Sequence, residues 1–138
     1  MAKLNPYLSF NGTCEAALSF YKKCFGGELK IMTVGASPMA ASMPKEMQSS
    51  VMHGLLEADG IRIMASDMLD GDKLERGNAM SLMLQCSSEA ELRDLFGKLS
   101  PGGTVNAPVK EEFWGAIYGD LTDKFGVRWM LNYDKPQA

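Results

Sequence analysis

Histidine and cysteine are scarce in this chain of 138 residues: His53 stands alone, and the three cysteines form no Cys-x-x-Cys pair. An odd number of cysteines without that spacing argues against a disulfide framework and against a thiolate zinc knuckle, and it favours a reducing cytoplasm. No apolar run approaches the ~18 residues of a membrane span. The N-terminus lacks the hydrophobic core of a signal peptide. We therefore expect a cytoplasmic protein that does not enter a membrane.

Basic charge is also in short supply. The 14 Lys and Arg residues face 17 Asp and Glu residues, so the net charge is −3. Nucleic-acid binding needs a basic face, and we expect no nucleic-acid partner. The chain also lacks a glycine-rich cofactor loop, and we expect no cofactor. With 46% apolar and 22% charged residues, the composition is that of one globular domain.

What the chain does contain is an internal repeat. Residues 60–64 (GIRIM) return as residues 126–130 (GVRWM), and residues 15–18 (EAAL) return as residues 89–92 (EAEL), in the same order. Two halves of about 65 residues therefore share one plan.

Periodicity and turn residues predict the same order of elements in both halves. The first half should contain a strand, a helix that starts at Thr13 and stops at Gly26-Gly27, and three strands, at residues 7–11, 13–26, 29–34, 51–58 and 61–66. The second half should contain the equivalent elements, with a capping box at the helix start, at residues 81–86, 88–99, 104–109, 113–121 and 127–133. Residues 35–50 show no sustained period, and we expect a long mobile loop, which at this length is commonly a lid or a binding loop.

Each half is thus a βαβββ module, and the fold class is α+β. We expect one domain over residues 1–138, with module one at about 4–67, a linker at about 68–79 and module two at about 80–133. One helix cannot cover both faces of a four-stranded sheet. We therefore expect the helices on the outer face of one curved, mostly antiparallel sheet around a cleft. Open sheet edges also predict a homodimer.

Several strings resemble the vicinal oxygen chelate superfamily of glyoxalases, bleomycin-resistance proteins and dioxygenases, and in particular its PhnB-like branch. They are residues 6–10 (PYLSF), 20–21 (FY) before 25–27 (FGG), His53, 64–67 (MASD) and 122–130 (TDKFGVRWM). The likeness spans nearly the whole chain. It implies the paired-module fold, but it does not imply one reaction, because this scaffold supports many.

The resemblance also says where a metal would bind. Metal-using members take ligands from the first and last strands of each module, which correspond here to about Tyr7, Met64, Ser81 and Met130. A hard divalent ion prefers carboxylate, imidazole or water oxygens. A phenol, a hydroxyl and two thioethers do not supply them, so we expect no metal at the usual site. An atypical site through His53 stays open.

Strand alternation assigns His53, Leu55 and Glu57 to one face of residues 51–58, and Arg62 and Met64 to the same face of residues 61–66. We expect these side chains to face the cleft. His53 and Glu57 lie on the same strand face, four residues apart, and could act as acid and base. The alternative is a structural histidine and a solvated glutamate.

Three aromatic residues, Tyr7, Trp114 and Tyr118, could form walls of the cleft with polar tips, although Trp114 could instead pack in the core or in a dimer. Arg62 and Arg128 could bind an anionic ligand, or could reach solvent or a dimer partner.

Two functions follow from this arrangement. In the first, the protein binds a small apolar or amphipathic molecule through Tyr7, His53, Leu55, Met64, Ser81, Trp114, Tyr118 and Met130. In the second, it is an enzyme of lyase, isomerase or transferase type that uses His53 as acid or base, or an atypical metal site. The sequence leaves open whether any reaction is catalysed.

Overall fold

A computed structural model describes residues 1–71 and 73–136 of the chain. The chain divides into two compact units, Met1–Glu75 and Arg76–Ala138. Each unit contains one of the two predicted modules and is described by itself below.

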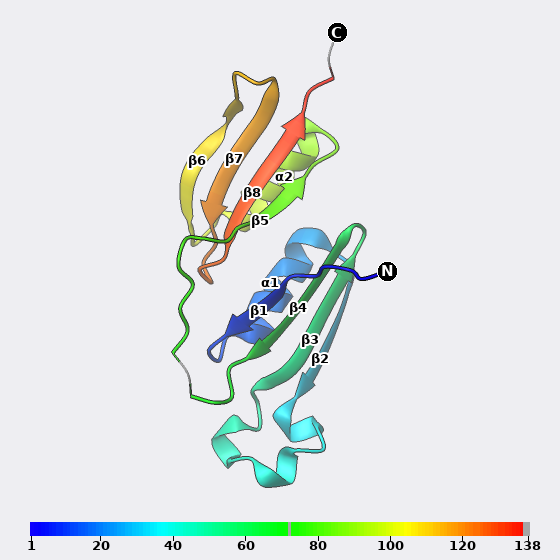
Figure 1. Cartoon of the computed structure of the whole chain (residues 1–138), viewed down its shortest axis with the longest axis vertical. Helices are drawn as coiled ribbons and strands as arrows, with labels where there is room; N and C mark the ends of the chain where they lie inside the picture. The colour runs from blue at the N-terminus through cyan, green and yellow to red at the C-terminus, as the bar shows by residue number, and fades with distance from the viewer. Residues whose placement is uncertain (72, 137–138) are drawn as a thin grey trace. The chain divides into compact units, whose positions relative to one another are not determined.

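Module one is a sheet with a helix on one face (Figure 1). Its elements are β1 (Tyr7–Phe10), α1 (Cys14–Phe25), β2 (Glu28–Thr33), β3 (Val51–Ala58) and β4 (Ile61–Asp67). The strand order is β1-β4-β3-β2. Strand β1 pairs with β4 in parallel, and the other pairs are antiparallel.

Module two repeats this plan with β5 (Leu82–Gln85), α2 (Glu89–Leu99), β6 (Thr104–Glu111), β7 (Ala116–Thr122) and β8 (Arg128–Asp134). The strand order is β5-β8-β7-β6, and β5 pairs with β8 in parallel. The α+β class and the tandem βαβββ modules are therefore confirmed. The joining of both sheets around a cleft stays a prediction.

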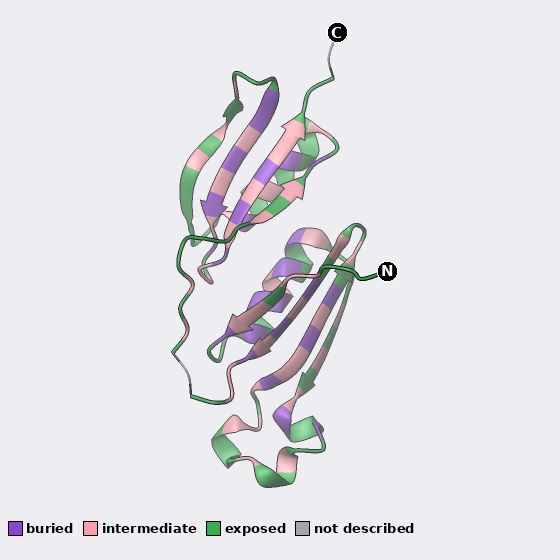
Figure 2. Cartoon of the chain, in the orientation of Figure 1, coloured by how far each residue is buried: buried purple, intermediate pink, exposed green. Residues whose placement is uncertain are grey.

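The alternation of side chains determines which face each helix covers. In β4, Ile63 and Ala65 are buried whereas Met64 and Ser66 are partly exposed, and Figure 2 shows the same alternation along β3, β7 and β8. The buried side chains lie under the helices, and those of α1 are Cys14, Ala17, Leu18, Tyr21 and Cys24. In module two, α2 packs on β7 and β8, and its buried Leu92 and Leu99 form a core with Leu121, Trp129 and Leu131.

Each helix packs against its sheet over a glycine in the third strand of the module, which is β3 in module one and β7 in module two. A Cβ added at Gly54 of β3 would collide with Leu18 Cδ1 of α1. A Cβ at Gly119 of β7 would lie 2.9 Å from Phe96 Cε2 of α2. The strand pairings put the two glycines at equivalent places, because Leu55 and Asp120, one residue further on, oppose Met64 and Met130. The missing Cβ therefore leaves room for the side chains of Leu18 and Phe96 at these places.

The backbone N–H groups at the starts of the two helices have different hydrogen-bond acceptors. Ser88 Oγ accepts a hydrogen bond from Glu91 N (3.0 Å), and Glu91 Oε1 accepts one from Ser87 N (2.9 Å), which confirms the predicted cap of α2. The Thr13 side chain makes no such bond at α1. The buried Asp67 replaces it: its Oδ1 accepts from Gly12 N (2.9 Å) and Cys14 N (3.0 Å), and its Oδ2 accepts from Val51 N (2.8 Å).

Residues 35–50, for which the sequence predicted a long mobile loop, contain short regular elements. They belong to a folded segment with three 3-10 helices, Val34–Ala36, Ala40–Ser42 and Lys45–Met47. The side-chain amide of Gln48 holds the segment together, because its Nε2 donates to the carbonyl oxygens of Ala40 (2.9 Å), Met43 (3.1 Å) and Pro44 (3.4 Å). Such contacts between a side-chain amide and backbone carbonyls have no periodic signature in the sequence.

A second difference concerns the start of β7, which begins at Ala116 instead of residue 113. Phe113 and Trp114 lie in the turn after β6, where Gly115 has a positive φ of 89°. The aromatic pair resembles a strand in sequence, but the chain reverses at the glycine that follows it.

Among the described residues, no helix is long and apolar enough to cross a bilayer.

We expect Asp67→Asn to lower the free energy of unfolding by about 2–4 kcal/mol, because it removes the charge that three backbone N–H groups share and turns part of the acceptor into a donor. Urea denaturation measures this loss. The control is Asp59→Asn at the exposed turn between β3 and β4, which should change the free energy by less than ~0.5 kcal/mol. Equal losses in the two variants would contradict the role of Asp67.

Candidate functional site

Each sheet has one face covered by its helix and one face that the helix does not cover, which we call the open face. On the open face of module one, Tyr7 pairs with Met64, and Met64 pairs with Leu55. Three of the predicted ligand-binding side chains therefore lie side by side across β1, β4 and β3. Tyr7 is 51% exposed, and Met64 and Leu55 are partly exposed, so the row is accessible.

His53 lies next to this row and is also partly exposed. The ring centroids of Tyr7 and His53 are 6.4 Å apart, and the Tyr7 hydroxyl donates to Ser66 Oγ (3.0 Å). On its other side His53 is paired with Met32 of β2, which is 39% exposed. The imidazole of His53 therefore has the Tyr7 ring on one side and Met32 on the other.

Glu57, the predicted partner of His53, has a different neighbour. Its Oε2 forms an ion pair with Arg62 NH1 at 3.1 Å, directly across the β3–β4 pairing. Both side chains are about half exposed. Such a surface pair stabilises the fold by less than ~1 kcal/mol, but it neutralises Arg62 on this face.

The strand pairings give the equivalent positions in module two. Met130 is paired with Met83 of β5 on one side and Asp120 of β7 on the other. Met83 and Asp120 therefore take the places of Tyr7 and Leu55. The sequence-based correspondence had used Ser81, which precedes β5 and lies two residues away from Met83. The sequence analysis did not find Met83 and Asp120. The repeat of Arg62-x-Met64 as Arg128-x-Met130 was the available signal, because it makes Met130 the equivalent of Met64, from which the neighbouring strands could have been aligned.

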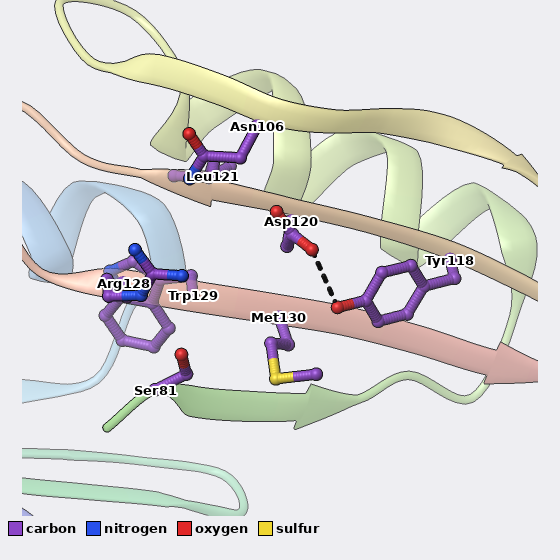
Figure 3. A pocket seen from close by; sticks show the side chains of 8 residues that line it. All are labelled: Ser81, Asn106, Tyr118, Asp120, Leu121, Arg128, Trp129 and Met130. Carbon is purple, nitrogen blue, oxygen red and sulfur yellow. Dashed lines mark hydrogen bonds between the residues drawn. The ribbon is translucent and has the colours of Figure 1, made fainter. Parts of the chain in front are cut away.

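A pocket of about 120 Å³ lies on the open face of module two. We call it the Arg128 pocket, and its polar and thioether lining consists of Ser81, Asn106, Tyr118, Asp120, Arg128 and Met130. Leu121 and Trp129 contribute to its floor. Figure 3 shows the side chains of Arg128, Asp120 and Tyr118 on one side of the sheet, with helix α2 behind it.

Tyr118 closes one end of the pocket, at the place equivalent to His53 in module one. Its hydroxyl donates to Asp120 Oδ2 at 2.8 Å. Burial, together with the hydrogen bond to Asp120 and the charge of that carboxylate, raises the pKa of Tyr118 to about 12. The phenol is therefore a hydrogen-bond donor at neutral pH and not a base.

Arg128 lies at the other end, and its environment differs from that of Arg62. Arg128 of β8 is paired with Thr122 of β7, whereas the equivalent Arg62 in module one is paired with Glu57. The Thr122 hydroxyl accepts from Asn106 Nδ2 at 3.0 Å. The Nε atom of Arg128 is buried and makes no hydrogen bond within the described part of the chain.

Trp114 lies close to Tyr118 but outside the lining of the pocket. Their ring centroids are 6.3 Å apart, and Phe113 stacks edge-on against Trp114 at 5.0 Å. The structure thus brings Ser81, Tyr118 and Met130 together in one pocket, with Trp114 beside it. It groups Tyr7, His53, Leu55 and Met64 on the open face of the other module.

The donor set does not fit the divalent metal of the superfamily. The four positions in the first and last strands of the two modules hold Tyr7, Met64, Met83 and Met130. None of these side chains is a good ligand for a hard ion. Within residues 1–71 and 73–136, no three His, Cys, Asp or Glu side chains gather in a group that could hold a metal.

Residues 2–132 match the model of the family described as 3-demethylubiquinone-9 3-methyltransferase. The chain belongs to this family. It is 34% identical to protein YjdN of Escherichia coli strain K12 over 97% of each chain. Among solved structures, it is similar to protein PA1353 of Pseudomonas aeruginosa, with 36% identity, a TM-score of 0.87, and coverage of 99% of this chain and 100% of that one.

The PhnB protein of Bacillus cereus is a further structural relative, with 26% identity and a TM-score of 0.76 over 96% of this chain and 99% of that one. At 14% identity, the fold alone is shared with a glyoxalase/bleomycin resistance protein/dioxygenase from Nocardioides, with a TM-score of 0.60 over 100% of this chain and 87% of that one. The resemblance to the PhnB-like branch of this superfamily is therefore confirmed.

We expect chelator-treated protein to bind no Zn²⁺, Mn²⁺ or Mg²⁺ in stoichiometric amount, because the ligand positions hold thioethers and a phenol. Elemental analysis and titration calorimetry measure this. Binding of one metal per chain would contradict the expectation, and a His53→Ala variant would then show whether the single imidazole is a ligand.

The stability of the fold should also depend on Tyr118 at alkaline pH. The phenol titrates near 10 when unfolded and near 12 when folded, so its stabilising contribution is complete below pH 10 and lost as the pH rises towards 12. The difference in unfolding free energy between wild type and Tyr118→Phe should be constant up to pH 10 and then shrink. Urea denaturation at pH 8, 10 and 11 measures it, and a constant difference up to pH 11 would rule out the raised pKa.

Proposed function

We propose that this protein binds a small apolar or amphipathic molecule on its open sheet faces, without a divalent metal. The observation that carries the proposal is the row of Tyr7, Met64 and Leu55, which presents one aromatic, one thioether and one aliphatic side chain to solvent. Their equivalents Met83 and Met130 lie beside a pocket with polar walls. Apolar surface with a few placed polar groups is what a small-molecule site requires.

The methionines suit this purpose. Met32, Met64, Met83 and Met130 are all partly or largely exposed, although unbranched apolar side chains of this size are normally buried. A thioether side chain is flexible and polarizable, so several of them can adapt to ligands of different shape. This supports binding of an apolar body more than recognition of one rigid polar substrate.

An enzyme of lyase, isomerase or transferase type is the alternative, and the position of His53 favours it. The imidazole is partly exposed, and Tyr7, whose hydroxyl is hydrogen-bonded to Ser66, lies against it. A histidine in such a place can act as a general acid or base. The family's description names methyl transfer to a demethylubiquinone, but this chain has no glycine-rich loop for a methyl donor.

A homodimer remains part of the proposal. Strands β1 and β2 are the edges of one sheet, and β5 and β6 are the edges of the other. Unpaired strand edges are places where a second copy can add.

The binding proposal is tested with the uncharged fluorescent probe N-phenyl-1-naphthylamine. We expect the wild type to bind it and the double variant Leu55→Gln, Met64→Gln to bind it about tenfold more weakly, because two apolar side chains lose their contact with the probe. Fluorescence titration measures the dissociation constant.

The matched control is Val105→Gln, an exposed apolar residue of β6 whose strand partner, Leu121, is buried on the α2 side. It should bind the probe as the wild type does. An equal loss in this control, or no saturable binding by the wild type, would contradict the proposal.

The variant His53→Ala separates binding from catalysis. Once a ligand that the protein converts has been found, loss of turnover with affinity retained would support the enzyme. Calorimetry with S-adenosylmethionine tests methyl transfer in particular, and we expect no binding.

A further inference from the structure

Arg62 and Arg128 are equivalent residues of the two modules, yet among the described residues only Arg62 has a charged partner. Arg62 forms its ion pair with Glu57 across the β3–β4 pairing at 3.1 Å. Thr122 occupies that place in module two, and its hydroxyl accepts a hydrogen bond from Asn106. No carboxylate of the described residues forms an ion pair with Arg128, and its buried Nε has no acceptor.

An unsatisfied guanidinium N–H is costly when it is shielded from water. Leaving one buried donor without an acceptor destabilises a protein by about 1–3 kcal/mol. The Arg128 side chain lines a pocket instead of packing into the core, so an acceptor that enters the pocket can contact the guanidinium after a small shift of this side chain. A ligand oxyanion would supply the acceptor that Glu57 supplies in module one.

We propose that the Arg128 pocket binds the carboxylate group of an amphipathic ligand, with the guanidinium of Arg128 as its anchor. Ser81 and Asn106 line the same pocket and can add hydrogen bonds from a hydroxyl and an amide. This inference rests on the proposed small-molecule binding and specifies the chemical class of the ligand.

The charge of the pocket favours a carboxylate over a phosphate. Asp120 lines the pocket together with Arg128, and one of its oxygens accepts from the Tyr118 hydroxyl. Its negative charge offsets that of Arg128, so a dianion would gain little attraction over a monoanion, because the attraction to Arg128 and the repulsion from Asp120 both double with the charge of the ligand. The planar guanidinium also matches a carboxylate with two parallel hydrogen bonds.

The size of the pocket indicates a subsite for a head group. Its volume of about 120 Å³ is smaller than the ~300 Å³ at which pockets begin to hold whole drug-sized ligands. Met130 lines the pocket, and its strand neighbour Met83 is 51% exposed. An apolar group attached to the carboxylate would lie on these thioethers.

Benzoate and benzyl alcohol are the probes, because they share a ring and differ in the charged group. Titrations of the ¹⁵N-labelled full chain, followed by NMR, give both dissociation constants and the resonance of Arg128 Nε–H. Benzoate should bind at least about tenfold more tightly than benzyl alcohol and should shift this resonance. Arg128→Gln should abolish the preference for benzoate, whereas the matched variant Arg62→Gln should keep it.

A second variant tests the comparison between modules without removing the arginine. Thr122→Glu places a carboxylate where module one has Glu57, so it should pair with Arg128 and weaken benzoate binding about tenfold, while Thr122→Gln should weaken it less. This pair of variants decides the matter if Arg128→Gln does not fold.

Four results would overturn the inference: equal affinity for benzoate and benzyl alcohol, tighter binding of inorganic phosphate than of benzoate, equal losses in the Arg62 and Arg128 variants, or equal losses in the two Thr122 variants. Equal affinity for the two ring probes would leave the proposed function standing. Failure of N-phenyl-1-naphthylamine to bind the open face of module one would contradict the proposed function independently of these results.

Discussion

The packing of one helix against one face of a four-stranded sheet is the constraint on which the rest of each module depends. Side chains in a strand alternate between the two faces, so burying Ile63 and Ala65 under α1 necessarily directs Met64 and Ser66 to the other face. The same holds for Trp129 and Leu131 against Arg128 and Met130 in β8. The chemistry of the open face is therefore positioned by apolar contacts on the opposite side of the sheet.

Most of this arrangement could be predicted from the sequence, because it depends on the order of neighbouring residues. The alternation in β4 and β8, the capping box at Ser88 and the repeated Gly-x-Arg-x-Met string located the strands, the second helix and the duplication. The helix cap supplied by Asp67 and the segment held by Gln48 were not predictable. Asp67 reaches backbone groups distant in sequence, and Gln48 reaches carbonyl groups four to eight residues away in an irregular segment. Neither kind of contact leaves a periodic trace.

The candidate site was predicted in part, for a related reason. Parity along a strand placed His53, Leu55 and Met64 on one face, and the β3–β4 pairing agrees with this. Parity cannot say which residue of a neighbouring strand stands opposite, so Met83 and Asp120 were missed. The ion pair of Glu57 with Arg62, and the lack of an equivalent for Arg128, become visible only when both registers are known.

The glycines at positions 54 and 119 leave room for helix side chains in both halves, because a Cβ at either place would meet Leu18 or Phe96. In a chain with two copies of one module, the helix-covered face had to keep such contacts in each copy for the copy to fold. The open face carried no such requirement. Substitutions there could accumulate in one copy alone, and a scaffold of this kind can acquire new ligands by small steps without passing through an unfolded ancestor.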